Sequence, residues 1–301
     1  MNDQLKSLGS SVDGLPLSVW PTGQRSPLEQ LRDAGCVPGT QIDDERIPPA
    51  VAAHAIAVYS RLGDLVLDPD CGAGTVLTAA LSAGRDALGL TGRTRWWSLA
   101  RANVTAAKTA GAWRDGSVFD ARPKVLATAR AAGLIGRVGL VLTALRMEPE
   151  PTNGPDRDPV ESALADAAAT MLYGESLLRS GGHFVIVARP RRRPDSTLAD
   201  LATPLIAAAT TAGLALVERC VALTAGLRGS QLVTRASLPA RRAAARARTV
   251  GVPTALPAHH EVLVFGLAHD VELAAAAASG VPRRPRLDAA GAVRAGWGRA
   301  A

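Results

Sequence analysis

The sequence has few aromatic residues and almost no lysine. Its 301 residues include five Trp, three Phe and two Tyr, so the core must be built mainly from Ala, Val and Leu. Lys6, Lys108 and Lys124 are the only lysines, and arginine supplies nearly all of the positive charge. Because abundant Arg and Ala can reflect a GC-rich genome, this bias alone says little about function.

Metal-binding and disulfide patterns are also missing. Cys36, Cys71 and Cys220 are far apart, and no histidine has ligand partners at metal spacing. We therefore expect no metal site and a reducing, cytoplasmic environment. The first residues lack the apolar segment of a signal peptide, and no apolar run reaches the length of a membrane span, so we expect no membrane association.

The charge balance favours an anionic partner. The net charge is +7 and the isoelectric point is near 10.1. Such a balance describes association and solubility rather than fold. Nucleic acid is the natural candidate, and a solvated basic surface is the alternative.

The stretch from Asp64 to Thr75, DLVLDPDCGAGT, has the strongest local pattern in the chain. Three consecutive apolar residues predict a short buried strand that ends at Asp68. A turn with Gly72 and Gly74 follows, and Thr75 opens an Ala- and Leu-rich helix that Gly84 ends. Glycines let a ligand approach the backbone, and a helix start offers free N–H groups, so this unit is suited to a nucleotide.

The glycine spacing separates the classes of nucleotide site. A dinucleotide fingerprint needs a third glycine where this chain has Leu77, and the Gly-Lys-Ser/Thr of a phosphate loop is absent. The spacing of Asp68, Gly72 and Gly74 is instead that of S-adenosylmethionine sites. An ordinary strand-to-helix turn is the alternative.

Strands alternate with helices along most of the chain. Further strands are expected at 86–90, 116–120, 138–143, 183–189, 214–223 and 261–267. Helices are expected at 48–63, 93–112, 123–132, 160–180 and 198–213, and an Arg- and Ala-rich helix at 239–250. This order predicts an α/β fold with a seven-stranded, doubly wound, Rossmann-like methyltransferase sheet whose last strand is antiparallel. We expect an N-terminal extension over 1–45, a methyltransferase domain over 46–268 and a flexible basic tail over 269–301.

From about Trp20 to Phe265 the chain resembles the DNA-modification-methylase-like amino methyltransferases, including the branch related to tRNA guanosine methyltransferases. The segment LVLDPDCGAGTVLTAALSAGRDALGL is similar to the cofactor motif and second strand of that family. RSGGHFVIVARP, ERCVALTAGLRGSQLVTRAS and HHEVLVF resemble its later strands. The resemblance implies S-adenosylmethionine as cofactor and a nucleic acid, DNA or tRNA, as substrate.

The resemblance places cofactor-binding residues in the first turn and at the ends of the next two strands. The family's acid near the adenine amino group matches Asp120, which could equally cap a following helix. At the second strand end, where the family has a carboxylate for the ribose hydroxyls, this chain has Thr91. Losing one charge-assisted hydrogen bond costs about 1.5–3 kcal/mol, so we expect weakened cofactor binding. The candidate cofactor residues are Asp68, Pro69, Cys71, Gly72, Gly74, Thr75, Thr91 and Asp120.

The family's catalytic tetrad is replaced. Amino methylation uses Ser/Asp/Asn-Pro-Pro-aromatic after the fourth strand, to hold the amine and to stack on a flipped base. The matching positions here are Ala144, Leu145, Arg146 and Met147. Arg146 also brings a positive charge to where a cationic sulfonium should lie, which is unfavourable unless its side chain points away. Glu148 and Glu150 could accept a proton, but solvated loop acids are the simpler interpretation.

Eleven arginines and three acidic residues lie between Arg189 and Arg248. The candidate nucleic-acid contacts are Arg191, Arg192, Arg193, Arg242 and Arg246, and Arg242 and Arg246 lie one helical turn apart. The sequence thus favours a methyltransferase-family protein with weakened or lost catalysis. A non-catalytic nucleic-acid-binding or regulatory protein with the same fold is the first alternative, and a methyltransferase with another acceptor is the second.

Overall fold

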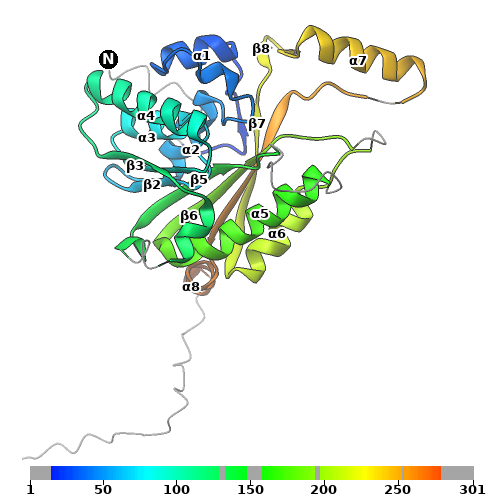
Figure 1. Cartoon of the computed structure of the whole chain (residues 1–301). Coiled ribbons are helices and arrows are strands. Elements are labelled where there is room, and N and C mark those ends of the chain that lie inside the picture. Colours follow the sequence, from blue (N-terminus) through cyan, green and yellow to red (C-terminus); the bar gives the residue numbers. More distant parts are fainter. Residues whose placement is uncertain (1–14, 129–132, 148–157, 194–196, 253, 279–301) are drawn as a thin grey trace, which may run out of the picture.

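The computed structural model describes residues 15–128, 133–147, 158–193, 197–252 and 254–278. Eight strands form one sheet in the order β1-β7-β10-β6-β5-β2-β3-β4 (Figure 1). In chain order the bounds of these strands are β1 Val19–Trp20, β2 Leu65–Asp68, β3 Asp86–Thr91, β4 Gly116–Asp120, β5 Val138–Ala144, β6 Leu178–Ala188, β7 Leu214–Leu223 and β10 His259–Leu267.

The predicted seven-stranded sheet is confirmed. β10 pairs antiparallel with β6 and β7, and every other pair in the sheet is parallel. β1 adds an eighth strand beside β7 through Val19 and Trp20. From β2 the chain proceeds to β3 and β4 on one side, and β5 and β6 lie on the other. β2 is therefore a topological switch point, where ligands bind at the carboxyl ends of the strands in open α/β sheets.

Helices cover both faces of the sheet (Figure 1). α2 (Pro49–Tyr59), α3 (Thr75–Ser82) and α4 (Thr94–Thr109) share one core with the sheet. α5 (Pro159–Gly174) and α6 (Ala202–Thr211) share the other. Ala, Val and Leu fill most of both cores, as the scarcity of aromatic residues predicts.

The segment before α2 packs onto the domain. α1 (Pro27–Asp33) begins at Ser26, which forms a capping box with Glu29 and precedes Pro27 at the first helical position. Trp20 in β1 is 1% exposed and stacks near His54, with ring centroids 4.4 Å apart. This aromatic residue therefore anchors the N-terminal segment against α2.

Four predicted helices differ from the structure. The helix predicted over 48–63 ends at Tyr59. Pro123–Ala127 forms a 3-10 helix instead of an α-helix to residue 132, because Thr128 is already extended, and 129–132 lie outside the described residues. The helix predicted over 160–180 ends at Gly174, a 3-10 turn spans Glu175–Leu177, and β6 then begins. The helix predicted from Leu198 begins at Ala202.

Gly181 and Gly182, which follow the helix predicted over 160–180, lie inside β6. Gly181 has a φ of +68°, and a Cβ on Gly182 would lie 2.8 Å from the Arg179 carbonyl oxygen. The ladder with β5 shifts register nearby, between Val138 and Leu140. These two glycines therefore accommodate the irregular pairing of β6 with β5.

The chain leaves the sheet between β7 and β10. A hairpin of β8 (Gly226–Arg228) and β9 (Gln231–Val233) is followed by the predicted Arg- and Ala-rich helix, α7 (Leu238–Thr249). In Figure 1, α7 stands away from the layered body. α8 (Ala268–Ala278) follows β10 at the opposite end of the sheet, and residues 279–301 lie outside the described part.

Candidate functional site

The turn after β2 has the geometry that the sequence predicts. Gly72 and Gly74 have φ angles of +49° and +84°, and Gly74 is the N-cap of α3. The Cys71 N–H donates to the Leu90 carbonyl oxygen at 2.8 Å, which ties the turn to β3. Thr75 opens α3, and its hydroxyl donates to the Ile47 carbonyl oxygen at 2.9 Å. The turn thus lies at the switch point with its conformation fixed from both sides.

The space beside Gly72 holds two of the protein's own side chains. A Cβ on Gly72 would lie 2.1 Å from Asp43 Oδ2 and 2.5 Å from Arg146 Nη1. A Cβ on Gly74 would lie 3.0 Å from the backbone and the side chain of Ala100 in α4. Both glycines are therefore required by internal packing.

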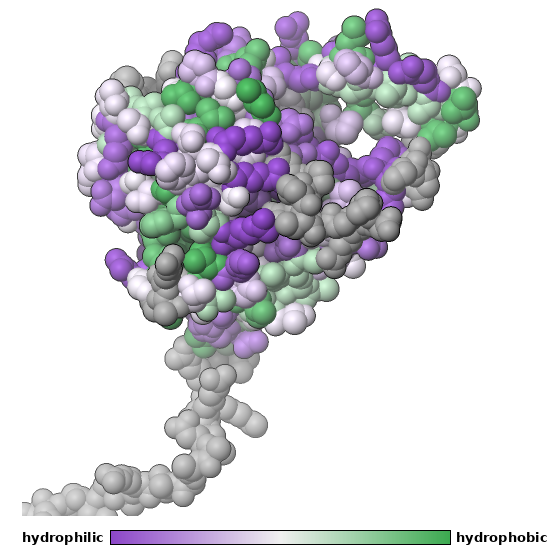
Figure 2. Space-filling view, in the orientation of Figure 1, coloured by the Kyte–Doolittle hydropathy of each residue, from purple (hydrophilic) through white to green (hydrophobic). Residues whose placement is uncertain are grey.

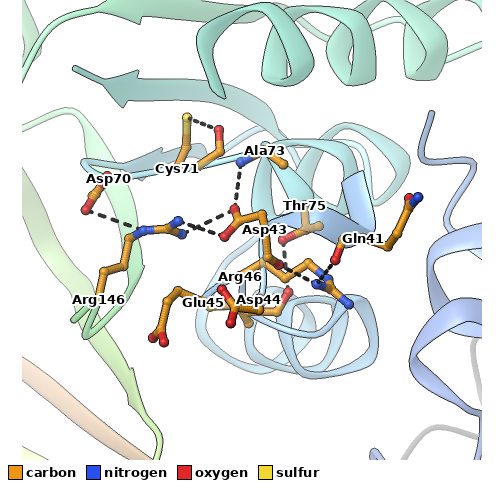
Figure 3. Close-up of polar contacts among 12 residues, drawn as sticks. Gln41, Asp43, Asp44, Glu45, Arg46, Asp70, Cys71, Ala73, Thr75 and Arg146 are labelled. Carbon is orange, nitrogen blue, oxygen red and sulfur yellow. Dashed lines mark hydrogen bonds and ion pairs between the residues drawn. The ribbon is translucent and has the colours of Figure 1, made fainter. Parts of the chain in front are cut away.

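Asp43 and Arg146 form a buried ion pair (Figure 3). Arg146 Nη2 donates to Asp43 Oδ1 at 2.7 Å, and Nη1 donates to Oδ2 at 3.3 Å. The same Asp43 Oδ2 accepts the Ala73 N–H at 2.8 Å. The Asp43 side chain is 0% exposed and the Arg146 side chain is 6% exposed. Asp43 thus uses both oxygens to join the loop before α2, the glycine turn and the end of β5.

Asp70 contributes a second carboxylate to Arg146. Arg146 Nε lies 3.7 Å from Asp70 Oδ2, on the side of the guanidinium away from Asp43 (Figure 3). Two carboxylates therefore face one guanidinium, and the local charge is negative. The unfavourable positive charge expected at Arg146 is offset by this arrangement.

Asp68 is buried at the end of β2. Burial raises the pKa of its carboxyl to about 8, and the nearby Asp70 carboxylate acts in the same direction. Its Oδ1 accepts the Asp70 N–H at 3.2 Å. The folded protein therefore holds the Asp68 proton more tightly than an exposed carboxyl would.

A pocket of about 340 Å³ opens at the carboxyl ends of β2, β3, β4 and β5. Its polar rim includes four cationic and two acidic side chains, and its inner wall includes apolar residues of β6 and α5. The charged lining residues are Arg93, Arg122, Lys124, Arg146, Asp70 and Asp166. The pocket lies at the switch point, where this class of sheet places its ligands.

Two candidate cofactor residues lie at neighbouring strand ends. Thr91 is 1% exposed, and its hydroxyl has no hydrogen-bond partner among the described residues. Asp120 is exposed at the end of β4, opposite Thr91 in the ladder. The 3-10 helix that follows has Arg122 at its N-cap, so Asp120 does not cap it. Of the candidate cofactor residues, only Pro69 is in the pocket lining. The others are not: Asp68, Cys71, Gly72, Gly74, Thr75, Thr91 and Asp120.

The replaced tetrad begins at the last residue of β5, and three of its four residues line the pocket. Ala144, Leu145 and Arg146 are lining residues, and Leu145 is buried with its N–H bonded to the Val187 carbonyl oxygen at 2.9 Å. Met147 packs against the α5 side of the core. Glu148 and Glu150 lie outside the described residues.

The structure separates the predicted basic residues into two groups. Arg191 pairs with Glu45, and Arg193 Nε lies 4.0 Å from Asp158 Oδ2. Arg192 bridges backbone-to-backbone with Leu198. Arg242 and Arg246 are exposed on α7, away from this cluster.

Sequence reasoning missed Asp43 and the pocket role of Tyr173. Asp43 opens an acidic triplet before Arg46, and this triplet was the available signal. Tyr173, inside the helix predicted over 160–180, packs on the core while also lining the pocket. Within the described ranges, no cluster of three or more metal-ligating side chains occurs, and no helix is both long and apolar enough to cross a membrane.

No protein-family model and no curated protein sequence matches the chain. Among solved structures, TrmN from Thermus thermophilus is similar with a TM-score of 0.45 and 16% identity, over 79% of this chain and 53% of that one. This chain therefore spans about half of that structure's length.

Two further structures match most of their own length. A TehB-like SAM-dependent methyltransferase from Corynebacterium glutamicum has a TM-score of 0.40 and 14% identity, over 80% of this chain and 94% of that one. A geranyl diphosphate methyltransferase in complex with SAM has a TM-score of 0.45 and 13% identity, over 78% and 94%. The fold itself is established by the strand order described above.

Proposed function

We propose that the protein binds S-adenosylmethionine at the switch point of its sheet and acts on nucleic acid as a member of the amino methyltransferase group. The observation that carries the proposal is the pocket at the ends of β2 to β5, beside the Asp68–Thr75 turn. In open α/β sheets this is the position of a bound nucleotide. When bound, the cofactor supplies an electrophilic methyl group on a positively charged sulfur.

The residues around the pocket are compatible with this cofactor. Thr91 precedes the lining residues Gly92 and Arg93 and is itself 1% exposed. Its hydroxyl has no partner among the described residues, and we propose that it bonds one ribose hydroxyl of the bound cofactor. Asp43 and Asp70 offset the positive charge of Arg146, whereas Arg93, Arg122 and Lys124 add positive charge elsewhere in the lining. Because Ala73 N–H already donates to Asp43, that backbone group is not available to the cofactor.

We further propose that the protein does not methylate an exocyclic amine through the family's tetrad. Ala144, Leu145 and Met147 offer no side-chain oxygen to accept amine hydrogens. The Arg146 guanidinium carries only donors, and its three nitrogens face Asp43 and Asp70. Methyl transfer would therefore need a different acceptor or a different acid or base.

Equilibrium dialysis with labelled S-adenosylmethionine tests the cofactor site. The wild type should bind, Thr91→Val should bind more weakly, and Thr91→Asp should bind roughly ten- to a hundredfold more tightly because a carboxylate makes charge-assisted bonds. Failure of all three folded proteins to bind would refute the cofactor proposal. Equal binding by all three proteins would refute the proposed contact between residue 91 and the ribose.

Methyl transfer is tested on duplex DNA and bulk tRNA with the same labelled cofactor. We expect binding of nucleic acid without methylation of an amino group. Transfer of the labelled methyl group to an amino group of the nucleic acid would contradict the proposal that the protein does not methylate exocyclic amines, provided that this transfer is lost in Asp68→Ala.

A non-catalytic nucleic-acid-binding or regulatory protein is the second candidate function. The observation in its favour is that Asp43, Arg146 and Ala100 account for the glycines of the turn without a ligand. The dialysis experiment separates the two candidates, since the second one predicts nucleic-acid binding without any cofactor binding.

A further inference from the structure

The segment between β7 and β10 carries positive charge only. Residues 226–249, here called the basic arm, comprise β8, β9 and α7. They contain six arginines and no Asp, Glu or Lys. The arginines are Arg228, Arg235, Arg241, Arg242, Arg246 and Arg248.

The base of the arm is fixed to the body of the protein. Arg235 donates from Nε to the Gly23 carbonyl oxygen at 3.1 Å and from Nη2 to the Gln24 carbonyl oxygen at 2.6 Å. The Leu227 N–H donates to Gln24 Oε1 at 3.2 Å. Packing is close there, because a Cβ on Gly23 would lie 2.2 Å from the Ala225 carbonyl oxygen. The arm therefore leaves the body in a defined direction.

The outer part of the arm contacts little of the body. Of the α7 residues only Ala244 is buried, whereas Arg242, Arg246 and Arg248 are all exposed. Figure 2 shows the arm standing out from the rest of the molecule, with an opening between them. An isolated helix of 12 residues is marginally stable in water, so such a helix gains stability when it binds a partner.

The arm emerges at the pocket's edge of the sheet. β7 is antiparallel to β10, which is antiparallel to β6, so β7 and β6 run in the same direction. The arm follows the carboxyl end of β7, and the pocket lies at the carboxyl ends of β2 to β5. A partner held by the arm is therefore on the side of the sheet where the pocket opens.

The other basic cluster differs in its surroundings. Arg191 is paired with Glu45, and Arg193 lies beside Asp158. No acid occurs on the arm, so phosphate groups are the complementary partners of its exposed charge. Arg242 and Arg246 are spaced about 6 Å along the helix, close enough to contact neighbouring phosphates of one duplex.

We infer that the basic arm is a docking element for duplex DNA, which α7 contacts along the phosphate backbone and major groove. This inference deepens the nucleic-acid part of the proposed function and rests on it. The middle of α7 consists of Ala243, Ala244 and Ala245, so the helix is slim. The major groove of B-DNA is about 12 Å wide and admits an α-helix, whereas that of duplex RNA is too deep and narrow.

The test is the salt dependence of binding to a short, fluorescently labelled DNA duplex, with the full-length chain. Arg242→Ala/Arg246→Ala removes two contacts while keeping a strong helix former at both positions. Each contact contributes about 0.9 to the slope of log K against log salt, so the slope should fall by about 1.8. The affinity at about 0.1 M salt should fall roughly fiftyfold.

Two further variants serve as controls. Arg242→Lys/Arg246→Lys keeps the charge and should keep the salt slope. Arg61→Ala/Arg137→Ala removes two exposed arginines that precede β2 and β5 at the opposite edge of the sheet, and it should bind almost as the wild type does. Equal losses in the two alanine variants would show that only net charge matters and would overturn the inference.

The remaining outcomes separate this inference from the proposed function. A wild type that binds no nucleic acid refutes the nucleic-acid part of the proposed function and the arm with it. A wild type that binds DNA equally well without Arg242 and Arg246 refutes the arm alone. Tighter binding of a duplex RNA of the same sequence would overturn the choice of DNA, and self-association through α7 without DNA binding would make the arm an interface between copies.

Discussion

Arg146 and Asp43 are 103 residues apart in the sequence and meet beside Gly72, with Arg146 Nη2 at 2.7 Å from Asp43 Oδ1. The loop before α2 and the end of β5 are thereby joined across the turn that follows β2. This ion pair lies at the position where the family resemblance places the reacting edge. We therefore expect it to contribute to the stability of the turn.

Breaking the Asp43–Arg146 pair from one side should strongly destabilise the protein. Arg146→Met leaves the fully buried Asp43 carboxylate without its cation, and we expect a loss of about 3–5 kcal/mol in the free energy of unfolding. The double variant Asp43→Asn/Arg146→Met should lose much less than the sum of the two single variants. Urea denaturation of the four proteins gives the coupling energy.

The exposed pair Arg25–Asp33 is the matched control for this cycle. Its side chains are 63% and 48% exposed and its shortest N–O distance is 2.9 Å. The corresponding coupling should stay below about 1 kcal/mol. A coupling at Asp43–Arg146 no larger than at Arg25–Asp33 would mean that the buried pair does not hold the turn.

Gly72→Ala should lower the free energy of unfolding far more than the same substitution at another glycine with a positive φ. The new methyl group would clash with Asp43 and Arg146, and we expect a loss of roughly 3–5 kcal/mol. Gly35→Ala has a similar φ of +68° but no heavy atom within 4 Å of the new Cβ, so only backbone strain of about 1–2 kcal/mol applies. Thermal unfolding of both variants checks the difference, and equal losses would show that side-chain crowding at Gly72 is unimportant.

Asp68 should make the protein less stable as the pH rises. Its pKa in the folded protein is about 8, above the usual value of 3.8, so the folded state holds the proton more tightly than the unfolded state. The stabilising contribution is fully present below about pH 4 and is lost as the pH rises through 8, at about 1.4 kcal/mol per pH unit between the two pKa values. Denaturation across this range should show that Asp68→Asn removes this slope.

Asp115→Asn is the control for the pH experiment, because the Asp115 side chain is 97% exposed. It should leave the slope unchanged. A wild type and an Asp68→Asn variant with parallel pH profiles would contradict a raised pKa at Asp68.

The sheet could be predicted from sequence because its strands are short apolar runs that each follow a helix or a turn. β2, β3, β5 and β10 are buried on both faces over most of their length, and such strands read as continuous hydrophobic segments. The prediction of an α-helix after β4 was wrong because Pro123 and its neighbours suit the start of any helix. A short 3-10 helix that ends before Thr128 has no separate local signal in the sequence. β8 was missed although Gly229 and Ser230 form a two-residue hairpin connection.

The candidate site could be predicted only in part. The turn from Asp68 to Thr75 is a local pattern, and its backbone conformation is confirmed. The contact of Asp43 with Arg146 depends on how a loop and a strand end meet in three dimensions, so no local spacing indicates it. For the same reason the sequence could not separate Arg191, which Glu45 neutralises, from Arg242 on the exposed arm.

Calorimetric titration of S-adenosylmethionine into the wild-type protein tests the central claim most directly. A site in the pocket at the switch point of the sheet, lined by Pro69 and Asp70, predicts saturable heat with one molecule bound per chain. The titration should be repeated with S-adenosylhomocysteine, which should bind the same site and compete. The absence of binding heat for both ligands at high protein concentration, with the fold intact by circular dichroism, would contradict the claim.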